Sequence, residues 1–422
     1  MINKQNWDWE NGEKEIADIG TWKDKFLGVE EPYPSPDGEK IAAIVKPDEM
    51  EFSVCENGTV WEEVYDKVWY LRFGPDNRLT ALVSDTAEWT LAVDQAAWAH
   101  RFDYVWDTHF SEDGRRIVIA AQKDGRYMGV TDDTPWETDF ETMNNFSVSR
   151  DGEQTAAAVQ IVSFQSGDIF KFQEGTYSVA VNGRAWPNNF VNVWEIAFSP
   201  DNQHVAAAIR VNLYDYTIAV DGVPWRQTFN GVWEPQFSSR DSSVTAPVRT
   251  GGKWMLAKNG EVLWDRQFVQ LWHHQYSPDG ATIAAIVAPE FGRWTVAVNG
   301  KPWSITFGDL VTDMVFSPDG AKVACVGKEK GQWSIAIDGV RWPGAFDMAW
   351  KPVFSHDGNN VAAKVEKNGQ YSLVINGKLL QKQFDMIWNP IFSPDGDKLL
   401  IRGIKSGETK YYRQVVPLAE LF

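Results

Sequence analysis

Cysteine and histidine, which bind transition metals and take part in nucleophilic catalysis, are few in this chain of 422 residues. The two cysteines, Cys55 and Cys325, lie far apart in the sequence. The six histidines are His100, His109, His204, His273, His274 and His356. His273 and His274 form the one adjacent pair. Adjacent residues of a β-strand point to opposite faces, so these two rings could share a metal only at a bulge. These residues therefore predict no metal site.

The motifs that mark common active sites are also missing from the sequence. There is no G-x-S-x-G nucleophile elbow, no G-x-G-x-x-G or phosphate-binding loop, and no C-x-x-C or C-x-x-C-H spacing for zinc, iron–sulfur clusters or haem. Aspartates recur in turns and could suggest calcium, but a turn aspartate usually caps nearby backbone N–H groups. We therefore predict a protein that is not an enzyme, with no catalytic, metal-binding or cofactor-binding residues and no cofactor.

Composition and charge narrow the class of protein further. The chain has 43% hydrophobic and 23% charged residues, which is typical of a folded globular protein, and its net charge is −18. Such an acidic surface repels phosphate backbones, which argues against a nucleic-acid partner. The excess charge either keeps a large β protein soluble or forms a docking surface for a basic partner.

The first residues, Met-Ile-Asn-Lys-Gln-Asn-Trp-Asp-Trp-Glu, contain no apolar core of a signal peptide, and no run of 18 apolar residues occurs in the chain. We therefore expect no cleaved secretory signal and no direct membrane span. The sparse cysteines favour a reducing compartment, so we expect a cytoplasmic protein.

The elements that must position all these residues are repeats. A turn of the type Ser35-Pro36-Asp37-Gly38 recurs 37 to 40 residues apart, except for one interval of 50. Its first residues are Ser35, Gly74, Ser111, Ser149, Ser199, Ser238, Ser277, Ser317, Ser355 and Ser393. Proline presets φ for the turn and glycine accepts positive φ. Each turn joins two predicted strands.

A hairpin is the second signature of the repeat. An aromatic residue leads a strand that in seven of the ten repeats ends in Asn-Gly or Asp-Gly, the strongest short hairpin signal. These lead aromatics are Phe52, Trp89, Tyr127, Tyr177, Tyr216, Trp254, Trp294, Trp333, Tyr371 and Tyr411. The return strand carries Trp-x-x-x-Phe, as at Trp136 and Phe140, with weaker copies at Trp61/Tyr65 and Leu380/Phe384. Four short antiparallel strands per period of about 40 residues are typical of a propeller blade.

We therefore predict an all-β fold, a β-propeller of ten four-stranded blades, with residues 1–422 as one domain. Residues 1–21 are assigned to an N-terminal extension. Trp22 and Phe26 match the fourth-strand signature, so residues 22–26 are predicted to be a closing strand that completes the last blade beside Tyr411. One closed ring is the simpler arrangement, and two five-bladed propellers are the alternative.

The 22 tryptophans follow the repeats. Besides the hairpin Trp, a second Trp lies five residues before the Ser-Pro-Asp-Gly turn in seven repeats: Trp69, Trp106, Trp194, Trp233, Trp272, Trp350 and Trp388. Residues at fixed places in the repeat are expected to pack blade against blade. An electron-hopping chain and a ligand-stacking ring are the rival interpretations.

One segment departs from the repeat. In the fourth repeat the first residue of the turn, Ser149, and the lead aromatic, Tyr177, are 28 residues apart, whereas this interval is 15 to 18 residues in the other repeats. The difference arises because residues 163–176 form a loop insertion. It carries Phe164, Ile169, Phe170 and Phe172, which either pack on their own blade or dock a partner. We name these four as the candidate partner-docking residues.

The Phe-Ser-Pro-Asp-Gly turns followed by small-residue strands, complete at 316–320 and 392–396, resemble the WD40-like propeller repeats of TolB-type proteins. This resemblance covers nearly the whole chain and implies the fold rather than the function. The density of Trp on this scaffold is similar, more narrowly, to the tryptophan-rich cytoplasmic propeller subunit of the Tmc-type transmembrane redox complex of sulfate-reducing bacteria.

That narrower resemblance implies a function. In the Tmc-type complex a periplasmic multihaem cytochrome c, a membrane cytochrome b and a cytoplasmic iron–sulfur protein carry the electrons, and the propeller subunit has no cofactor. We therefore expect a non-catalytic scaffold or accessory subunit, peripheral at the inner face of the cytoplasmic membrane, whose partners are the iron–sulfur and cytochrome b subunits. A stand-alone ligand- or peptide-binding propeller is the alternative, and an enzyme using a propeller face ranks last.

Overall fold

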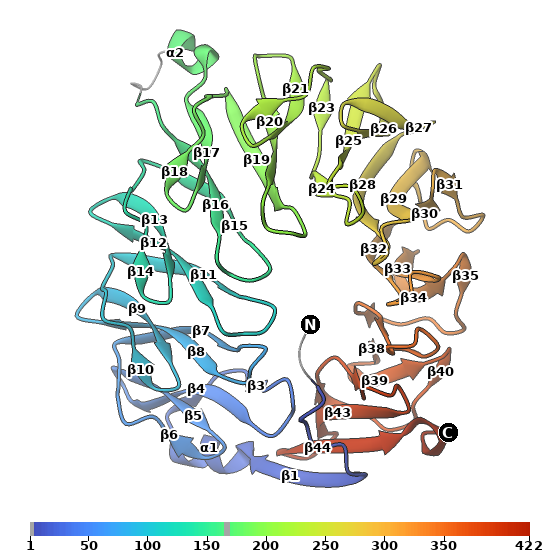
Figure 1. The fold of residues 1–422 in the computed structure, drawn as a ribbon. Helices are drawn as coiled ribbons and strands as arrows, with labels where there is room; N and C mark the ends of the chain where they lie inside the picture. The colour runs from blue at the N-terminus through green and yellow to red at the C-terminus, as the bar shows by residue number, and fades with distance from the viewer. Residues whose placement is uncertain (1–3, 164–168) are drawn as a thin grey trace.

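The computed structural model describes residues 4–163 and 169–422, without the side chain of Ile169. Antiparallel β-sheets dominate the fold. Their first strands, such as β7 and β11, face a common centre, and their last strands, such as β10 and β14, lie at the outer edge (Figure 1). The chain is an all-β β-propeller, as the turn and hairpin chemistry predicts.

Within the described residues the strands form nine sheets, and the first five end at Pro224. The first sheet contains β2 (Gly28–Val29), β3 (Tyr33–Pro34), β4 (Ile41–Asp48), β5 (Glu51–Glu56) and β6 (Thr59–Val60). The second contains β7 (Lys67–Phe73), β8 (Leu79–Asp85), β9 (Glu88–Val93) and β10 (Ala96–Ala97). The third contains β11 (Tyr104–Phe110), β12 (Ile117–Lys123), β13 (Arg126–Thr131) and β14 (Thr134–Pro135). The fourth contains β15 (Met143–Val148), β16 (Thr155–Gln160), β17 (Tyr177–Val181) and β18 (Arg184–Ala185). The fifth contains β19 (Asn192–Phe198), β20 (Val205–Arg210), β21 (Tyr216–Val220) and β22 (Val223–Pro224).

The remaining sheets follow in chain order. The sixth contains β23 (Gly231–Val232), β24 (Gln236–Phe237), β25 (Val244–Thr250), β26 (Lys253–Lys258) and β27 (Glu261–Phe268). The seventh contains β28 (Gln270–Tyr276), β29 (Ile283–Glu290), β30 (Arg293–Val298) and β31 (Lys301–Pro302). The eighth contains β32 (Leu310–Phe316), β33 (Val323–Glu329), β34 (Gln332–Ile337) and β35 (Val340–Arg341). The last has ten strands: β36 (Met348–Ala349), β37 (Val353–Phe354), β38 (Val361–Lys367), β39 (Gln370–Ile375), β40 (Lys378–Leu379), β41 (Phe384–Ile387), β42 (Ile391–Phe392), β43 (Lys398–Lys405), β44 (Lys410–Pro417) and β1 (Gly12–Asp18).

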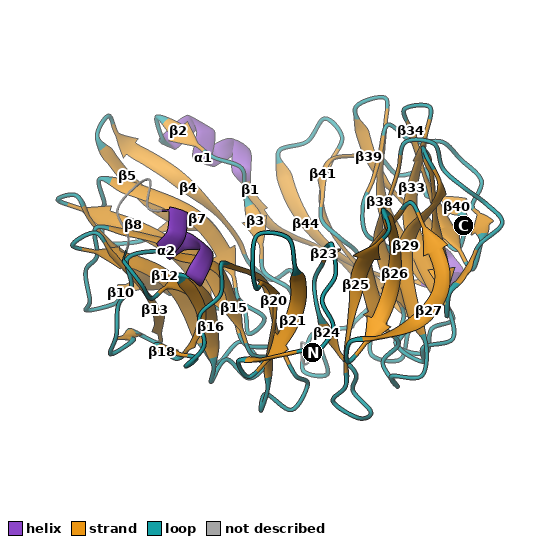
Figure 2. Ribbon diagram, turned by 90° about the horizontal axis from the view of Figure 1, so that it is seen from above, coloured by secondary structure: helices purple, strands orange, loops and turns teal. Residues whose placement is uncertain are grey.

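Helices are short and peripheral. They are α1 (Ile19–Lys25), α2 (Ile169–Glu174) and a 3₁₀ turn at Leu418–Glu420 (Figure 2). None of the helices in the described part of the chain is long and apolar enough to cross a membrane.

Local chemistry produces the predicted turns and pairings. In the hairpin at Asn182-Gly183 both residues have positive φ, 47° and 77°, as a two-residue turn of this kind requires. In the turns, the Asp319 carboxylate accepts hydrogen bonds from the Ser317 hydroxyl at 2.5 Å and from the backbone N–H of Ala321 at 3.0 Å. The turn aspartates therefore cap the backbone, as predicted. Lead aromatics also pair with the Phe of Trp-x-x-x-Phe, as Tyr127 does with Phe140.

The first strand of each repeat is irregular in one of two ways. In four repeats a proline, which cannot donate to the ladder, falls at the break between two short strands: Pro32, Pro235, Pro352 and Pro390. In the other six the strand is continuous, and the residue after the second-Trp position has a left-handed φ between 49° and 53°: Tyr70, Asp107, Asn145, Glu195, His273 and Asp313. Such bulges redirect a side chain next to functional sites as well as at sheet edges.

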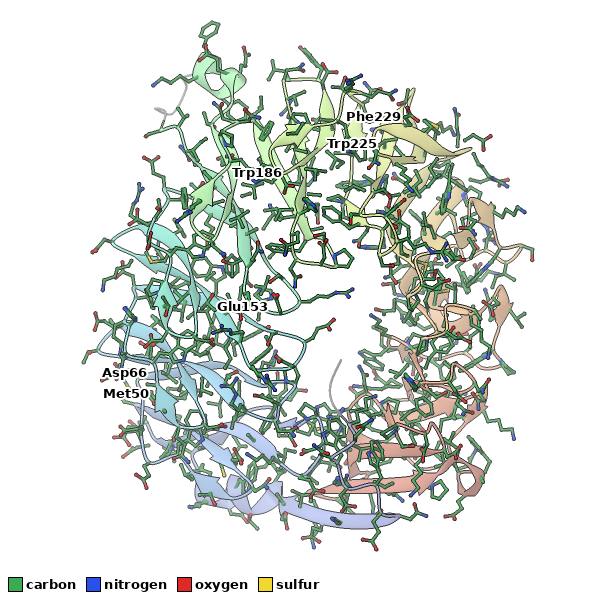
Figure 3. The ribbon with its side chains drawn as sticks, viewed as in Figure 1. Met50, Asp66, Glu153, Trp186, Trp225 and Phe229 are labelled. Carbon is green, nitrogen blue, oxygen red and sulfur yellow. The ribbon has the colours of Figure 1, made fainter. Side chains whose placement is uncertain are left out.

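The hairpin tryptophans pack between sheets, as predicted. In seven cases the indole lies over the turn glycine of the following repeat, and Trp186 and Trp225 are two of them (Figure 3). The pairs are Trp22–Gly58, Trp136–Gly183, Trp186–Gly222, Trp225–Gly260, Trp264–Gly300, Trp303–Gly339 and Trp342–Gly377. A Cβ on Gly183 would lie 3.0 Å from the Trp136 side chain, so this contact leaves no room for a larger residue.

The second set of tryptophans packs within its own sheet as well as at the junctions between sheets. Trp106, Trp194, Trp272 and Trp388 lie against hydrophobic clusters that each span two sheets, as predicted. Six of the seven contact the lead aromatic of their own repeat, with ring centroids 4.5 to 6.0 Å apart. The pairs are Trp106–Tyr127, Trp194–Tyr216, Trp233–Trp254, Trp272–Trp294, Trp350–Tyr371 and Trp388–Tyr411. The first and third strands of one sheet flank the second, so two large rings on the same face bridge it.

The N-terminal segment corrects one prediction. Residues 22–26 are not a strand, because Trp22 lies in α1 and the Phe26 N–H donates to the Trp22 carbonyl at 3.0 Å. The strand that pairs with β44 is β1, which falls inside the predicted extension 1–21. It forms a longer ladder than the two-residue fourth strands of most other repeats, and it leaves Trp22 no edge of β44 to join. Trp22 still reaches Gly58, so its packing role follows the repeat although its backbone does not.

Charge pairing accompanies this junction of the chain ends. Glu13 of β1 forms ion pairs with Lys382, at 3.1 Å, and with Lys405. Glu15 pairs with Lys410 at 2.8 Å. The N- and C-terminal segments of the chain therefore meet in one sheet, held by backbone and side-chain contacts.

Two buried arginines of the last sheet contact the first repeat. The Arg402 guanidinium, on a residue 8% exposed, donates to the Ser35 carbonyl at 2.9 Å. Arg413 is 1% exposed, and its Nε donates to the Asp37 carbonyl at 2.8 Å and lies 2.9 Å from a Glu39 carboxylate oxygen. The first Ser-Pro-Asp-Gly turn is thereby fixed to the end of the chain.

Candidate functional site

The histidine pair lies at a bulge, the one condition under which it could share a ligand. His273 has a φ of 49°, and the register of β28 against β29 shifts between Trp272 and Gln275. The rings nevertheless have different partners. His274 Nε2 lies 2.9 Å from Thr245 Oγ1, whereas His273 is exposed with its Nδ1 3.6 Å from Glu234. Burial lowers the pKa of His274 to about 3, so this ring is neutral and structural.

Neither cysteine has the environment of a nucleophile. Cys55 and Cys325 are buried and unpaired, each on a strand. Burial raises the pKa of Cys55 to about 11 and that of Cys325 to about 12, which keeps both thiols protonated. Across residues 4–163 and 169–422 no three histidine, cysteine, aspartate or glutamate side chains are grouped to hold a metal ion.

The insertion 163–176 contains α2, which projects beyond the sheets (Figure 1). Of the four candidate docking residues, Phe170 is 75% exposed and Phe172 is half-buried. Phe164 and the side chain of Ile169 lie outside the described residues. The structure thus brings one of the four clearly to the surface.

Cavities coincide with the repeats that lack the second tryptophan. Glu30, Asn144 and Thr312 occupy that position in the three exceptional repeats. Glu30 lines a cavity of about 510 Å³, Asn144 one of about 690 Å³ and Thr312 one of about 240 Å³. A smaller side chain where an indole stands elsewhere leaves such space unfilled.

The cavity at Asn144 is unlike the other two because aromatic rings line it. We call it the aromatic cavity, and its rings are Trp69, Tyr70, Tyr104, Trp106 and Tyr127. They come from the second and third sheets, and the fourth supplies Met143 and Asn144.

Two of these rings break the repeat. Tyr70 takes the left-handed bulge position that other continuous first strands give to Asp, Asn, Glu or His. Tyr104 is the one aromatic residue two places before the second-Trp position. Trp69 is 48% exposed, Tyr104 38% and Tyr70 37%, so three large rings face solvent together. Clusters of this kind mark binding sites more often than isolated exposed residues do.

The polar groups of the aromatic cavity are few. Asp107, at the bulge of β11, is its one charged residue. The nearby His109 is half-buried, and burial lowers its pKa, so it stays neutral beside that carboxylate. The Thr142 hydroxyl oxygen is buried and has no hydrogen-bond partner among the described residues. The cavity is therefore lined by aromatic rings, one negative charge and the side-chain amides of Gln122 and Asn144.

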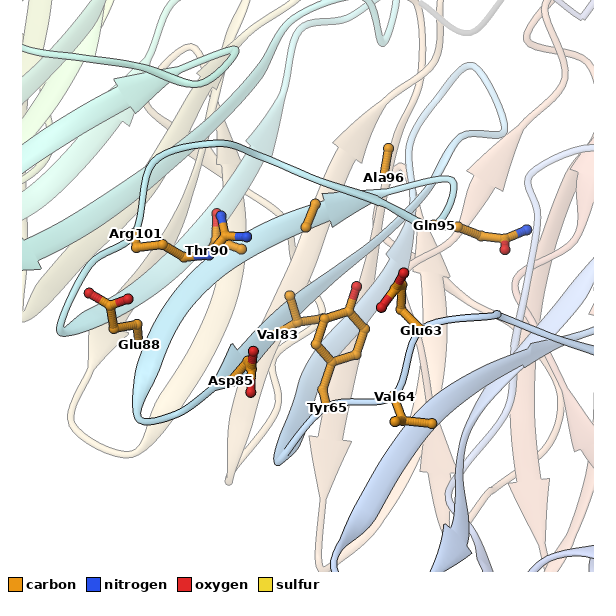
Figure 4. Close-up of a pocket in the computed structure, with 11 residues that line it drawn as sticks. Glu63, Val64, Tyr65, Val83, Asp85, Glu88, Thr90, Gln95, Ala96 and Arg101 are labelled. Carbon is orange, nitrogen blue, oxygen red and sulfur yellow. The ribbon is translucent and has the colours of Figure 1, made fainter.

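A polar cavity of about 400 Å³ lies by β8, β9 and β10 (Figure 4). Tyr65 stands where the other repeats have Phe, and its hydroxyl has no partner within the described part of the chain. Thr90 Oγ1 also has no hydrogen-bond partner among the described residues. The Trp98 and His100 carbonyls, which lie at the places that a hydroxyl at this position contacts in other repeats, accept hydrogen bonds from Arg101 instead. In the fourth repeat Ser178 takes the place of Thr90, and its hydroxyl donates at 2.8 Å to the carbonyl of Asn188, the residue in the place of His100.

Replacing Tyr65 by Phe is expected to stabilise the protein by about 1 kcal/mol, because it removes a buried hydroxyl without a partner and restores the residue of the repeat. Thermal unfolding of the full chain measures this. A lower melting temperature for Tyr65→Phe would mean that the hydroxyl has a partner and that the prediction is wrong.

Comparisons with known proteins address the fold alone. No protein-family model and no curated protein matches the sequence. Among solved structures, a eukaryotic initiation factor is 12% identical with a TM-score of 0.44, covering 97% of this chain and 100% of its own. The Cps50 (Swd1) β-propeller domain of Myceliophteria thermophila is 13% identical with a TM-score of 0.32, over 64% of this chain and 95% of its own. The Dos1 propeller is 12% identical with a TM-score of 0.38, over 96% of this chain and 94% of its own.

Sequence reasoning missed the aromatic cavity. The signal was present as a missing Trp at Asn144 and two additional tyrosines, Tyr70 and Tyr104. Their significance depends on three sheets meeting, which repeat spacing alone does not provide.

Proposed function

We propose that this propeller is a non-catalytic scaffold that binds protein partners. The observation that carries the proposal is Phe170, an aromatic side chain 75% exposed on the one insertion that interrupts the repeats. Regular packing of the sheets does not require this insertion. Burying an exposed Phe against a partner is favourable by roughly 25 cal/mol per Å² of apolar surface, and aromatic anchors are frequent hot spots.

We further propose that the partners are the iron–sulfur and cytochrome b subunits of a transmembrane redox complex, with the propeller peripheral at its cytoplasmic side. The support is the resemblance to the Tmc-type propeller subunit in Trp density and repeat pattern.

The same proposal includes one closed ring of ten blades. The ten-stranded sheet divides into two units of the repeat, joined by the Tyr371–Phe384 bridge that has isolated counterparts elsewhere. Pairing of β1 with β44 and the contacts of Arg402 and Arg413 with the first turn support closure. Pairing of the two chain ends covers the edge of β44 that an open array of blades would leave exposed.

Affinity purification of the tagged chain from detergent-solubilised membranes tests the redox partnership. The expected result is co-purification of a subunit with a b-type haem spectrum and of an iron–sulfur protein. Recovery of the chain free of both, from cells that contain such a complex, would reject the partnership.

Phe170→Ser is expected to weaken this association about tenfold while the melting temperature stays within a few degrees of the parent. The matched control is Phe291→Ser, which removes a Phe that is 94% exposed in the β29–β30 hairpin. Pull-down yields and melting curves of both variants are compared. Equal retention of partners by Phe170→Ser and Phe291→Ser would exclude α2 from the docking surface.

A second candidate function is a stand-alone ligand-binding propeller. The observation that favours it is the aromatic cavity, a preformed concave site with few polar groups, as ligand sites usually are.

A further inference from the structure

We propose that the aromatic cavity binds an organic cation whose charge is spread over a guanidinium or covered by methyl groups. This inference does not depend on the scaffold proposal, because it concerns another surface, formed by β7, β11 and the start of β15. The volume of about 690 Å³ is within the range of small-molecule sites.

The aromatic rings that line the cavity form a connected cluster. The Tyr104 and Trp106 rings are stacked, with centroids 5.9 Å apart and planes at 22°. Trp69 is tilted against Tyr104 at 6.4 Å, and Tyr127 meets Trp106 edge to face at 6.0 Å. Aromatic faces attract cations through the ring quadrupole, and tryptophan does so most strongly.

Asp107 favours a cation over an anion in this cavity, whose other nearby charge is the Arg72 guanidinium against Tyr70. Asp107 is exposed, and no Lys or Arg forms an ion pair with it among the described residues. The chain as a whole carries a net charge of −18, which repels anions and attracts cations. A neutral apolar ligand would gain nothing from the carboxylate. A delocalised or methylated cation also loses less hydration on entering than a lysine ammonium does.

The side chain of Arg72 already places a guanidinium against one of the rings that line this cavity. Arg72 Cζ lies 4.4 Å from the centroid of the Tyr70 ring and 4.4 Å from that of Tyr33. The guanidinium therefore contacts two tyrosine rings, one of which also lines the aromatic cavity. Tyr70 therefore already makes the kind of cation–ring contact that is proposed for the ligand.

Titration calorimetry on the full chain tests the proposal, with choline and arginine amide as probes and 3,3-dimethylbutan-1-ol as the uncharged analogue of choline. At least one cation is expected to bind with one-to-one stoichiometry, and the neutral analogue about tenfold more weakly than choline. Equal affinity for choline and its neutral analogue would overturn the proposal, because the cavity would then recognise shape and apolarity alone.

Two variants locate the binding. Asp107→Asn keeps the side-chain shape and a residue type that tolerates positive φ, and it should weaken cation binding about fivefold. Tyr104→Leu should weaken it further. The control is Asp313→Asn, at the same bulge position of β32 and outside the aromatic cavity, which should bind as the parent does. Full affinity in Asp107→Asn and Tyr104→Leu would place the cation elsewhere and reject this site.

The cation could be a free metabolite or a side chain of another protein. Peptides with a central arginine or trimethyl-lysine form the second arm of the titration. Binding of peptides but not of the free probes would assign the source to a protein, and binding of free probes alone to a small molecule. Failure of both arms at millimolar concentrations would overturn the proposal, and it would leave the α2 docking test unaffected.

Discussion

Deletion of residues 1–18 is expected to leave a protein that aggregates, or that melts roughly 10 °C or more below the full chain. The deletion removes β1 and exposes the edge of β44, an eight-residue strand. It also removes Glu13, so Lys382 and Lys405 lose their carboxylate partner. Unpaired strand edges recruit other chains, so loss of monomer should accompany loss of stability.

Melting curves and size-exclusion chromatography measure both effects. The matched control is deletion of residues 1–6, which leaves β1 and its pairing with β44 intact and should melt within a few degrees of the parent. A monomeric 1–18 deletion with the melting temperature of the full chain would contradict the role of β1 in joining the chain ends.

Arg413→Ala is expected to lower the free energy of unfolding by about 3–5 kcal/mol, the second large effect. Arg413 is 1% exposed, pairs with Glu39 and donates to backbone carbonyls of Asp37 and Asp8. Truncation leaves these acceptors without a donor and opens a cavity the size of an arginine side chain. Arg413→Lys keeps the charge but loses the planar fork, so an intermediate loss is expected.

Urea unfolding followed by Trp fluorescence gives the comparison. Arg116→Ala is the control, because Arg116 also makes two ion pairs, with Asp132 at 2.9 Å and Glu153 at 2.7 Å, but its side chain is 41% exposed. Its loss should cost less than about 1 kcal/mol. Similar urea midpoints for Arg413→Ala and Arg116→Ala would show that the burial of Arg413 at the first turn adds nothing to the stability of the protein.

The sequence by itself determined the fold class and the repeat. Ser-Pro-Asp-Gly turns and Asn-Gly hairpins are local: each is specified by a few adjacent residues whose φ preferences and side-chain hydrogen bonds act over short distances. The spacing of lead aromatic and Trp-x-x-x-Phe fixed the hairpin register, as the Tyr127–Phe140 bridge confirms. Regular placement also predicted that the hairpin tryptophans fill the gaps between sheets.

Tertiary structure alone decided how the chain ends meet. Trp22 and Phe26 have the spacing of the fourth-strand signature, but an interval of four residues also fits one helical turn. The edge of β44 pairs instead with residues 12–18, which form a longer ladder and place Glu13 and Glu15 beside lysines of the last sheet. Competition between two segments for one edge depends on contacts distant in sequence, which no local pattern encodes.

The aromatic cavity was decided in the same way. The absence of Trp at Asn144 is visible in the sequence, whereas the resulting space depends on how three sheets are set beside one another. Tyr70 faces it because a bulge with φ of 51° redirects the chain, and Tyr104 faces it from the next sheet. Repeats specify what each blade shares, and a binding site arises where departures in neighbouring blades converge in space.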